Sequence, residues 1–285
     1  MDINELIRKE GLRRGLRPRT IQTYQQCVER FFRKSGKEPL SLHKQDIKDF
    51  LDILINKGAP GNTLNVYLNA LKFFYEEILH RRLTINLRYS KVSKRLPDFL
   101  TKEETINLIS SIKNPKHSLM IRLLYSSGLR VGELLNLKIS NLNIKEGYGW
   151  VRNGKGGKDR PFIIAHSLQE ELHQYTTGKL PESWLFTGWN NSPYDDSSIR
   201  EILKKAVKNA KLSKKVHPHM LRHSFATHLI QNGYSPLEVQ PLLGHNNVNT
   251  TMIYVHLAAA NLFNVKSPYD SLQNMKPDHS NIHLK

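Results

Sequence analysis

The chain has 285 residues, of which 39% are hydrophobic, enough to bury the core of one large or two modest domains. Its 43 Lys and Arg outnumber its 25 Asp and Glu, and the formal charge of +18 favours a polyanionic partner, nucleic acid above all, over an anionic membrane surface. The sequence shows no signal peptide and no apolar run near the ~20 residues of a membrane span, and its single cysteine, Cys27, excludes an internal disulfide and a thiolate zinc cluster. We therefore expect a soluble cytoplasmic protein that binds nucleic acid.

Apolar residues at helical spacing predict four helices in the first part of the chain. A weak stripe opens it at residues 3–7, and stronger stripes follow at residues 21–32, 47–55 and 64–78, the last behind a possible cap at Asn62. Short amphipathic helices bury their stripes against one another, so residues 1–82 are predicted to form an N-terminal helical domain.

Residues 83–99 interrupt this pattern and are predicted to be an interdomain linker. Apolar periodicity fades there, and basic side chains gather ahead of Pro97, of which Lys91, Lys94 and Arg95 are predicted to contact nucleic acid. Residues 1–96 hold 20 Lys and Arg against 10 Asp and Glu, and residues 97–285 hold 23 against 15. Because both halves are basic, we expect both to touch the same partner.

The second domain, residues 100–266, opens with a capping box from Thr101 to Glu104. An apolar stretch then leads through Gly128 to Arg130, which places Arg130 at a junction between two helices. Glu133, three residues later, lies on the same helical face. By itself this pair is typical of an ordinary intrahelical ion pair worth a few tenths of a kcal/mol.

Two short strands are predicted next, at about residues 149–153 and 160–165, joined by a glycine-rich turn that carries Lys155. Such a turn can bring Lys155 close to a phosphate. A nucleotide-binding loop is disfavoured because the Gly-x-x-x-x-Gly-Lys-[Ser/Thr] order is missing and a strand follows in place of a helix. Lys158 and Arg160 are predicted to contact a nucleic-acid backbone.

Pro218 predicts the start of a helix that carries His219 and Arg222 on one face, near an N-terminus whose free amides favour anions. The spacing of His219 and His223 also fits a pair of zinc ligands, but no Glu lies between them and no third ligand is evident, so we expect no metal. His223 and His228 are predicted to be packing or surface histidines.

A second capping box, Ser235 to Glu238, starts a helix that Gly244 ends, and His245 follows directly. Tyr254 is then predicted to lie about a turn and a half inside the next helix. A tyrosine in such an apolar setting is usually a core residue. The polar residues 267–285 are predicted to be a flexible tail.

Taken together, six residues in this order and spacing resemble the catalytic set of the tyrosine recombinases: Arg130, Lys155, His219, Arg222, His245 and Tyr254. Residues 252–256 and 266–272 also resemble integron integrases, but the short interval between Phe186 and His217 has no room for their insertion, and the length is more Xer-like. The resemblance implies a mainly α fold with a small antiparallel β-sheet, in which an N-terminal four-helix core-binding (SAM-like) domain precedes the catalytic domain. It also implies that Glu133 is an acidic support of the site.

The chemistry of these side chains agrees with the resemblance. A phenol with a pKa near 10 is a poor nucleophile, so Tyr254 needs a base, for which His219 is the candidate. Arg130 and Arg222 neutralise the phosphoryl oxygens without a metal, and His245 adds a hydrogen bond. By resemblance, Lys155 protonates the leaving 5′ oxygen, leaving a 3′-phosphotyrosine that conserves the bond energy.

We therefore predict a prokaryotic, nucleoid-associated site-specific DNA recombinase that needs no ATP, metal or other cofactor. The resemblance implies strand exchange through a Holliday junction by a homotetramer on two DNA sites, with both domains clamping the duplex and a C-terminal segment docked in trans. A type IB topoisomerase and a catalytically idle DNA-binding regulator are the alternative functions.

Overall fold

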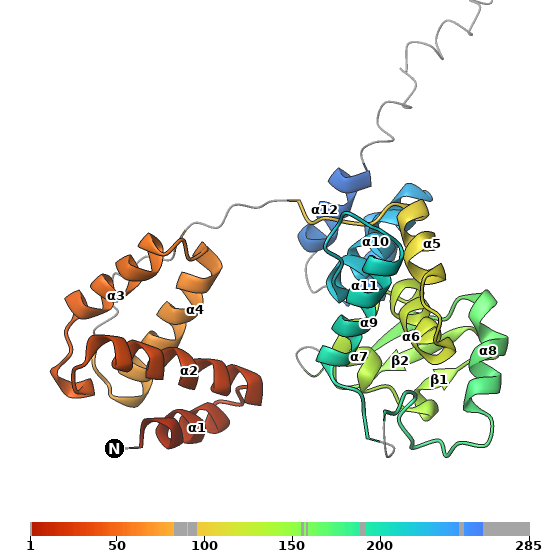
Figure 1. The fold of residues 1–285 in the computed structure, drawn as a ribbon. Helices are drawn as coiled ribbons and strands as arrows, with labels where there is room; N and C mark the ends of the chain where they lie inside the picture. Colours follow the sequence, from red (N-terminus) through yellow and green to blue (C-terminus); the bar gives the residue numbers. More distant parts are fainter. Residues whose placement is uncertain are drawn as a thin grey trace, which may run out of the picture. The chain divides into compact units, whose positions relative to one another are not determined.

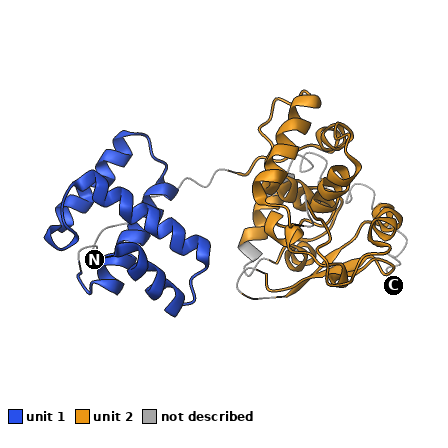
Figure 2. Ribbon diagram, turned by 60° about the horizontal axis from the view of Figure 1, so that its bottom comes forward, with its two compact units in different colours: residues 1–95 blue, residues 96–285 orange. Residues whose placement is uncertain are grey.

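A computed structural model describes residues 2–82, 90, 96–154, 157, 159–188, 192–244 and 248–258. The chain divides into two compact units, residues 1–95 and 96–285, which Figure 2 colours separately. The division falls within the segment predicted to be the interdomain linker. In the described part of the chain, no helix is both long and apolar enough to cross a membrane.

The first unit contains the expected helices, shown in red to orange in Figure 1. They are α1 (Ile3–Arg13), α2 (Pro18–Ser35), α3 (Lys44–Asn56) and α4 (Gly61–Lys72), with a 3₁₀ turn (Pro39–Ser41) before α3. The helix α4 runs on into a π-helical segment, η2 (Phe73–Ile78). The predicted cap at Asn62 was wrong, because Pro60 precedes the first residue of α4 and Asn62 lies inside the helix.

Aromatic packing holds these helices together. Phe31 of α2 is fully buried and meets Phe50 of α3 edge-on, with ring centroids 5.1 Å apart. It also lies edge-on to Tyr75 in η2, at 6.5 Å. Each such pair adds about 0.5–1.5 kcal/mol to the free energy gained by burying the rings. The apolar stripes of the sequence therefore meet in one core.

The second unit is mainly helical with a small sheet (Figure 1). In chain order its elements are α5 (Lys102–Ser110), α6 (Pro115–Ser126), α7 (Val131–Leu135), a 3₁₀ turn (Ile139–Asn141), β1 (Leu142–Asn143), β2 (Tyr148–Val151), β3 (Arg160–Ile163), α8 (His166–Thr176), α9 (Asp196–Asn209), α10 (Pro218–Gln231), α11 (Pro236–Leu243) and α12 (Val248–Ala258). Both predicted capping boxes are present, from Thr101 to Glu104 and from Ser235 to Glu238. The predicted fold class is confirmed.

The sheet is antiparallel with the order β1-β2-β3, and Val151, the last residue of β2, pairs with Arg160, the first residue of β3. Side chains alternate between its faces, so Arg160 and Phe162 of β3 are buried while Ile163 is exposed. The helix α10 packs against α6, α9, α11 and α12, and α11 packs against β3. This packing brings α7, β3, α10, α11 and α12 to one region, which holds most of the predicted catalytic residues.

Candidate active site

The structure describes some of the predicted site residues and leaves others outside its described part. Arg130, Glu133, Arg160, His219, Arg222 and Tyr254 are described. The predictions for the remaining residues fall outside the described part of the chain, and they concern Lys91, Lys94, Arg95, Lys155, Lys158 and His245.

Arg222 is buried at the centre of the described site. Its guanidinium donates one hydrogen bond to the Gly128 carbonyl at 2.6 Å and a second to the Leu243 carbonyl at the end of α11. Burial, followed by the positive charges of Arg130 and Arg160, lowers the pKa of Arg222 to about 9. The group stays charged at neutral pH, and an anion placed beside it relieves the repulsion.

Arg130 lies at the predicted junction between helices, as the residue that caps the start of α7. Gly128 makes the turn possible because its φ is +57° and because a Cβ there would lie 2.3 Å from the Phe225 ring. Glu133 accepts from the Arg130 guanidinium at 2.7 Å and from the Arg130 backbone N–H at 2.8 Å. The carboxylate thus orients a guanidinium that remains about a quarter exposed.

Arg160 is placed differently from the predicted backbone contact. It is 7% exposed, and its guanidinium donates to Glu133 at 2.6 Å and to the Leu242 carbonyl. Gly244 leaves room for it, because a Cβ there would lie 2.5 Å from the Arg160 Cδ. Strand alternation turns this side chain toward the interior, so its partner is a carboxylate of the protein where we had expected a DNA phosphate.

Glu133 consequently bridges two guanidiniums inside the unit. Burial raises the pKa of its carboxyl group, but the charge of Arg160 and the hydrogen bonds from Arg130 and Arg160 outweigh burial and hold the pKa below its usual value. Glu133 is therefore ionised at neutral pH. Through it, β3 is tied to Arg130 at the start of α7, and through the Leu242 carbonyl Arg160 ties β3 to the end of α11.

Tyr254 of α12 is 3% exposed, and its hydroxyl lies 3.0 Å from Nδ1 of His223 on α10. Burial raises the pKa of the phenol, while Arg222 and Arg130 act in the opposite direction. The tyrosine therefore lies in the same electrostatic environment as both guanidiniums. Its hydroxyl points into the unit and contacts a histidine.

His223, predicted to be a packing or surface histidine, is partly buried and packs against Tyr254, a contact within the candidate site that the sequence reasoning missed. His219 and His223 are four positions apart in the sequence, so the two share a helical face, and this spacing was the available signal that His223 also faces the site. Burial, then the charges of His219, His217 and Arg222, lower the pKa of His223 to about 4. The pKa of His219 is also lowered, by burial and by Arg222. Both imidazoles are neutral at pH 7.

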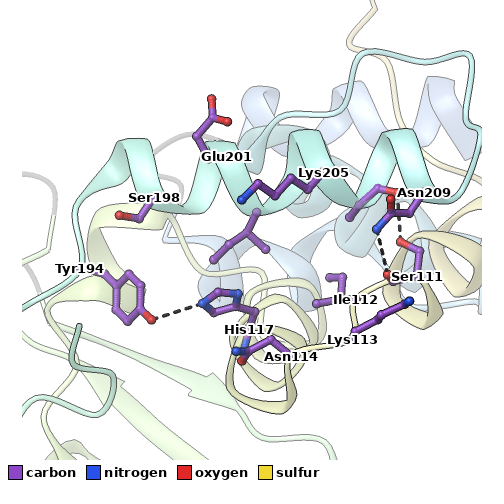
Figure 3. A pocket seen from close by; sticks show the side chains of 12 residues that line it. Ser111, Ile112, Lys113, Asn114, His117, Tyr194, Ser198, Glu201, Lys205 and Asn209 are labelled. Atoms are coloured by element: carbon purple, nitrogen blue, oxygen red, sulfur yellow. Dashed lines mark hydrogen bonds between the residues drawn. The ribbon is translucent and has the colours of Figure 1, made fainter. Parts of the chain in front are cut away.

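A separate hollow of about 390 Å³ lies between the start of α6 and α9 (Figure 3). His117 and Tyr194 line it and approach each other at 3.3 Å, and Lys113, Glu201 and Lys205 border it. Of the predicted catalytic residues that the structure describes, none lines this hollow. The cluster around Arg222 is therefore the candidate site for the chemistry that the sequence predicts.

Comparison with known proteins identifies the family of the chain. Residues 98–261 match the phage integrase family, and residues 4–85 match the phage integrase N-terminal SAM-like domain. Tyrosine recombinase XerA of Pyrococcus furiosus is 35% identical over 267 residues, which cover 92% of this chain and 91% of that protein. A tyrosine recombinase of Pseudothermotoga lettingae is 40% identical over 233 residues, covering 81% and 77%.

Solved structures show the same fold. A crystal structure of XerA recombinase is 29% identical, with a TM-score of 0.54, and the match covers 96% of this chain and 99% of that one. XerH site-specific recombinase bound to a palindromic difH substrate, in a post-cleavage complex, is 25% identical with a TM-score of 0.68, covering 88% and 80%. The chain belongs to the phage integrase family of tyrosine recombinases, as a site-specific recombinase of the Xer type.

Proposed function

We propose that this recombinase cleaves duplex DNA with Tyr254 as the nucleophile, forming a 3′-phosphotyrosyl bond. The observation that carries the proposal is the position of the phenol. Its hydroxyl is buried next to an imidazole and within the electrostatic influence of Arg130 and Arg222. Those guanidiniums are suited to binding the two non-bridging oxygens of the phosphodiester and to stabilising its five-coordinate transition state.

Lys155, from the turn between β2 and β3, is proposed to protonate the leaving 5′ oxygen, and His219 and His245 to contact the phosphoryl oxygens. The phosphotyrosyl bond conserves the energy of the cleaved phosphodiester, so rejoining to the 5′ hydroxyl of a second duplex requires no ATP. The guanidiniums supply the positive charge for which other phosphoryl transferases use a divalent ion. Strand exchange by this cleavage and rejoining passes through a Holliday junction.

DNA is the proposed partner, and the structure of XerH on its difH substrate supports it. Both halves of the chain carry an excess of Lys and Arg, and this positive charge favours binding of each half to the phosphate backbone. Lys91, Lys94, Arg95 and Lys158 are proposed as backbone contacts. We further propose a homotetramer on two sites, with a C-terminal segment docked in trans and the action located at the prokaryotic nucleoid.

Trapping of covalent product on nicked DNA tests the proposal. A nick close to the cleavage site lets the short product strand diffuse away, so the phosphotyrosyl protein accumulates. Tyr254→Phe should abolish the trapped product and leave DNA affinity nearly unchanged, because a single hydroxyl is removed. A normal yield from this variant would remove Tyr254 from its role. Joining of two marked duplexes then separates recombination from the topoisomerase alternative, and a wild-type chain that traps no product would support the idle regulator.

A further inference from the structure

The helix α10 carries two histidines, His223 partly buried and His228 buried, and each of them meets a tyrosine hydroxyl through Nδ1. His223 lies 3.0 Å from the hydroxyl of Tyr254, and His228 lies 2.8 Å from that of Tyr125. The second pair joins α10 to α6 in the packed interior, where His228 is 4% exposed. The first pair contains Tyr254, the proposed nucleophile. The two histidine–tyrosine pairs thus have the same chemistry, but only the pair of His223 and Tyr254 belongs to the candidate site.

The surroundings of His223 leave its imidazole neutral. Arg222, His219 and His217 act on it from its own helix, Tyr254 contacts it from α12, and Arg130 at the start of α7 acts on both Tyr254 and Arg222. A neutral imidazole whose proton is on Nε2 has a free lone pair on Nδ1. In that tautomer, the phenol of Tyr254, 3.0 Å away, donates a hydrogen bond to that lone pair.

Building on the proposed function, we propose that His223 is the base that accepts the phenol proton when Tyr254 attacks the phosphodiester. In this step the O–H bond of Tyr254 breaks and an N–H bond forms on Nδ1 of His223. The tyrosine oxygen bonds to phosphorus, and the bond from phosphorus to the 5′ oxygen breaks as that oxygen takes a proton from Lys155. In the reverse step His223 returns its proton to the departing tyrosine oxygen. This assignment replaces the predicted base, His219.

The strength of this base depends on whether DNA is present. The same positive charges that attract a phosphate make an imidazolium at His223 unfavourable in the empty site. A bound phosphodiester brings one negative charge into the cluster, and the transition state adds a second. Both charges favour protonated His223, so the base becomes stronger when its substrate arrives. Without DNA, the proton of Tyr254 correspondingly stays on the phenol.

The test uses single-turnover cleavage of nicked DNA by the full chain, measured across pH. The variant His223→Asn keeps a polar atom near the position of Nδ1 but cannot accept a proton. The matched control is His228→Asn, which disturbs the equivalent pair on the same helix. Thermal unfolding and DNA affinity are measured for both, and His223→Gln serves in place of His223→Asn if that variant does not fold.

The wild-type cleavage rate should fall toward acid pH, because a protonated His223 cannot accept a proton, and should level off above the pKa that His223 has in the DNA complex. His223→Asn should cleave roughly 10²–10⁴-fold more slowly, the range for loss of a general base, and should lose this acid limb. His228→Asn should keep the wild-type rate and limb even where its stability falls.

A rate for His223→Asn within a few-fold of wild type overturns the proposal. A slowed variant that keeps the acid limb also overturns it, since His223 would then orient the phenol while another group takes the proton. Tyr254→Phe separates this inference from the proposed function. If wild type forms a phosphotyrosyl product through Tyr254 while His223→Asn behaves normally, the role of His223 fails alone; if wild type forms none, the proposed function fails.

Discussion

Replacing Glu133 by Gln should destabilise the second unit far more than an ordinary surface substitution does. The side chains of Glu133 and Arg160 are each 8% exposed, and Arg160 Nη2 lies 2.6 Å from the carboxylate. Glu133→Gln keeps the shape but removes the negative charge, so the guanidinium of Arg160 stays buried without a counterion. Breaking a buried ion pair from one side costs about 3–5 kcal/mol. The amide oxygen of the glutamine side chain can still accept a hydrogen bond from Arg160, so we expect a cost near the lower end of this range, about 3 kcal/mol.

For a unit of this size, a loss of about 3 kcal/mol lowers Tm by roughly 6–12 °C. The assay can be specific to the unit, because the three tryptophans, Trp150, Trp184 and Trp189, all lie within residues 96–285. Tryptophan fluorescence during thermal unfolding therefore reports on the second unit. The control is Glu171→Gln, whose partner Arg122 lies at the same 2.6 Å but whose side chain is 38% exposed, so its loss is worth at most about 1 kcal/mol.

The difference between wild type and Glu133→Gln also depends on pH. The folded-state pKa of Glu133 lies below its unfolded value, so the carboxylate stabilises the fold above the unfolded pKa of about 4.3, and this contribution is lost as pH falls through the folded pKa. The gap in stability should therefore narrow in acid. A shift no larger than that of Glu171→Gln, or a gap that stays constant down to low pH, would refute the assignment of a buried counterion.

Three further expectations concern catalysis, binding and assembly. Lys155→Ala should slow cleavage of ordinary DNA roughly 10²–10⁴-fold but should cleave a 5′-bridging phosphorothiolate nearly normally, since a thiolate leaves without protonation. Arg130→Ala should not be rescued by the phosphorothiolate substrate. Equal slowing of Lys155→Ala on both substrates would show that the lysine only contacts the phosphate. DNA affinity in titrations should fall by roughly 0.9 log units per log unit of salt for each phosphate neutralised, and a flat response contradicts binding by both basic domains. Deleting residues from Asn261 onward should impair recombination of paired sites more than binding of a single site, and normal recombination by the truncated chain excludes docking in trans.

Local signals in the sequence predicted several helix boundaries correctly. Pro218 occupies the first position of α10, and Gly244 ends α11 with a positive φ of 58°. Each of these signals involves only a few neighbouring residues, so it can be recognised in a single sequence. The π-helical segment Phe73–Ile78 escaped prediction because its apolar spacing continues that of the preceding α-helix. The two-residue strand β1 is too short to show an alternation.

The site was predictable to the extent that helical spacing determines it. Arg130 with Glu133 and His219 with Arg222 are local pairs, and their shared faces follow from the helix period. The contacts of Arg160 and His223 depend on other elements, since Arg160 meets α7 and α11 while His223 meets α12. The inward direction of Arg160 was still readable from Phe162, two residues along the same strand face.

The charges of the site indicate how attack by Tyr254 is restricted to DNA. In the protein alone, burial raises the pKa of the phenol more than Arg222 and Arg130 lower it, so the pKa of Tyr254 lies above its ordinary value. A free phenolate is therefore scarce at neutral pH. A bound phosphate cancels part of the positive charge, which makes a phenolate still less favourable and an imidazolium at His223 more favourable. Substrate binding thus favours proton transfer concerted with attack over prior ionisation of the tyrosine, which is the circumstance in which a contacting base contributes most.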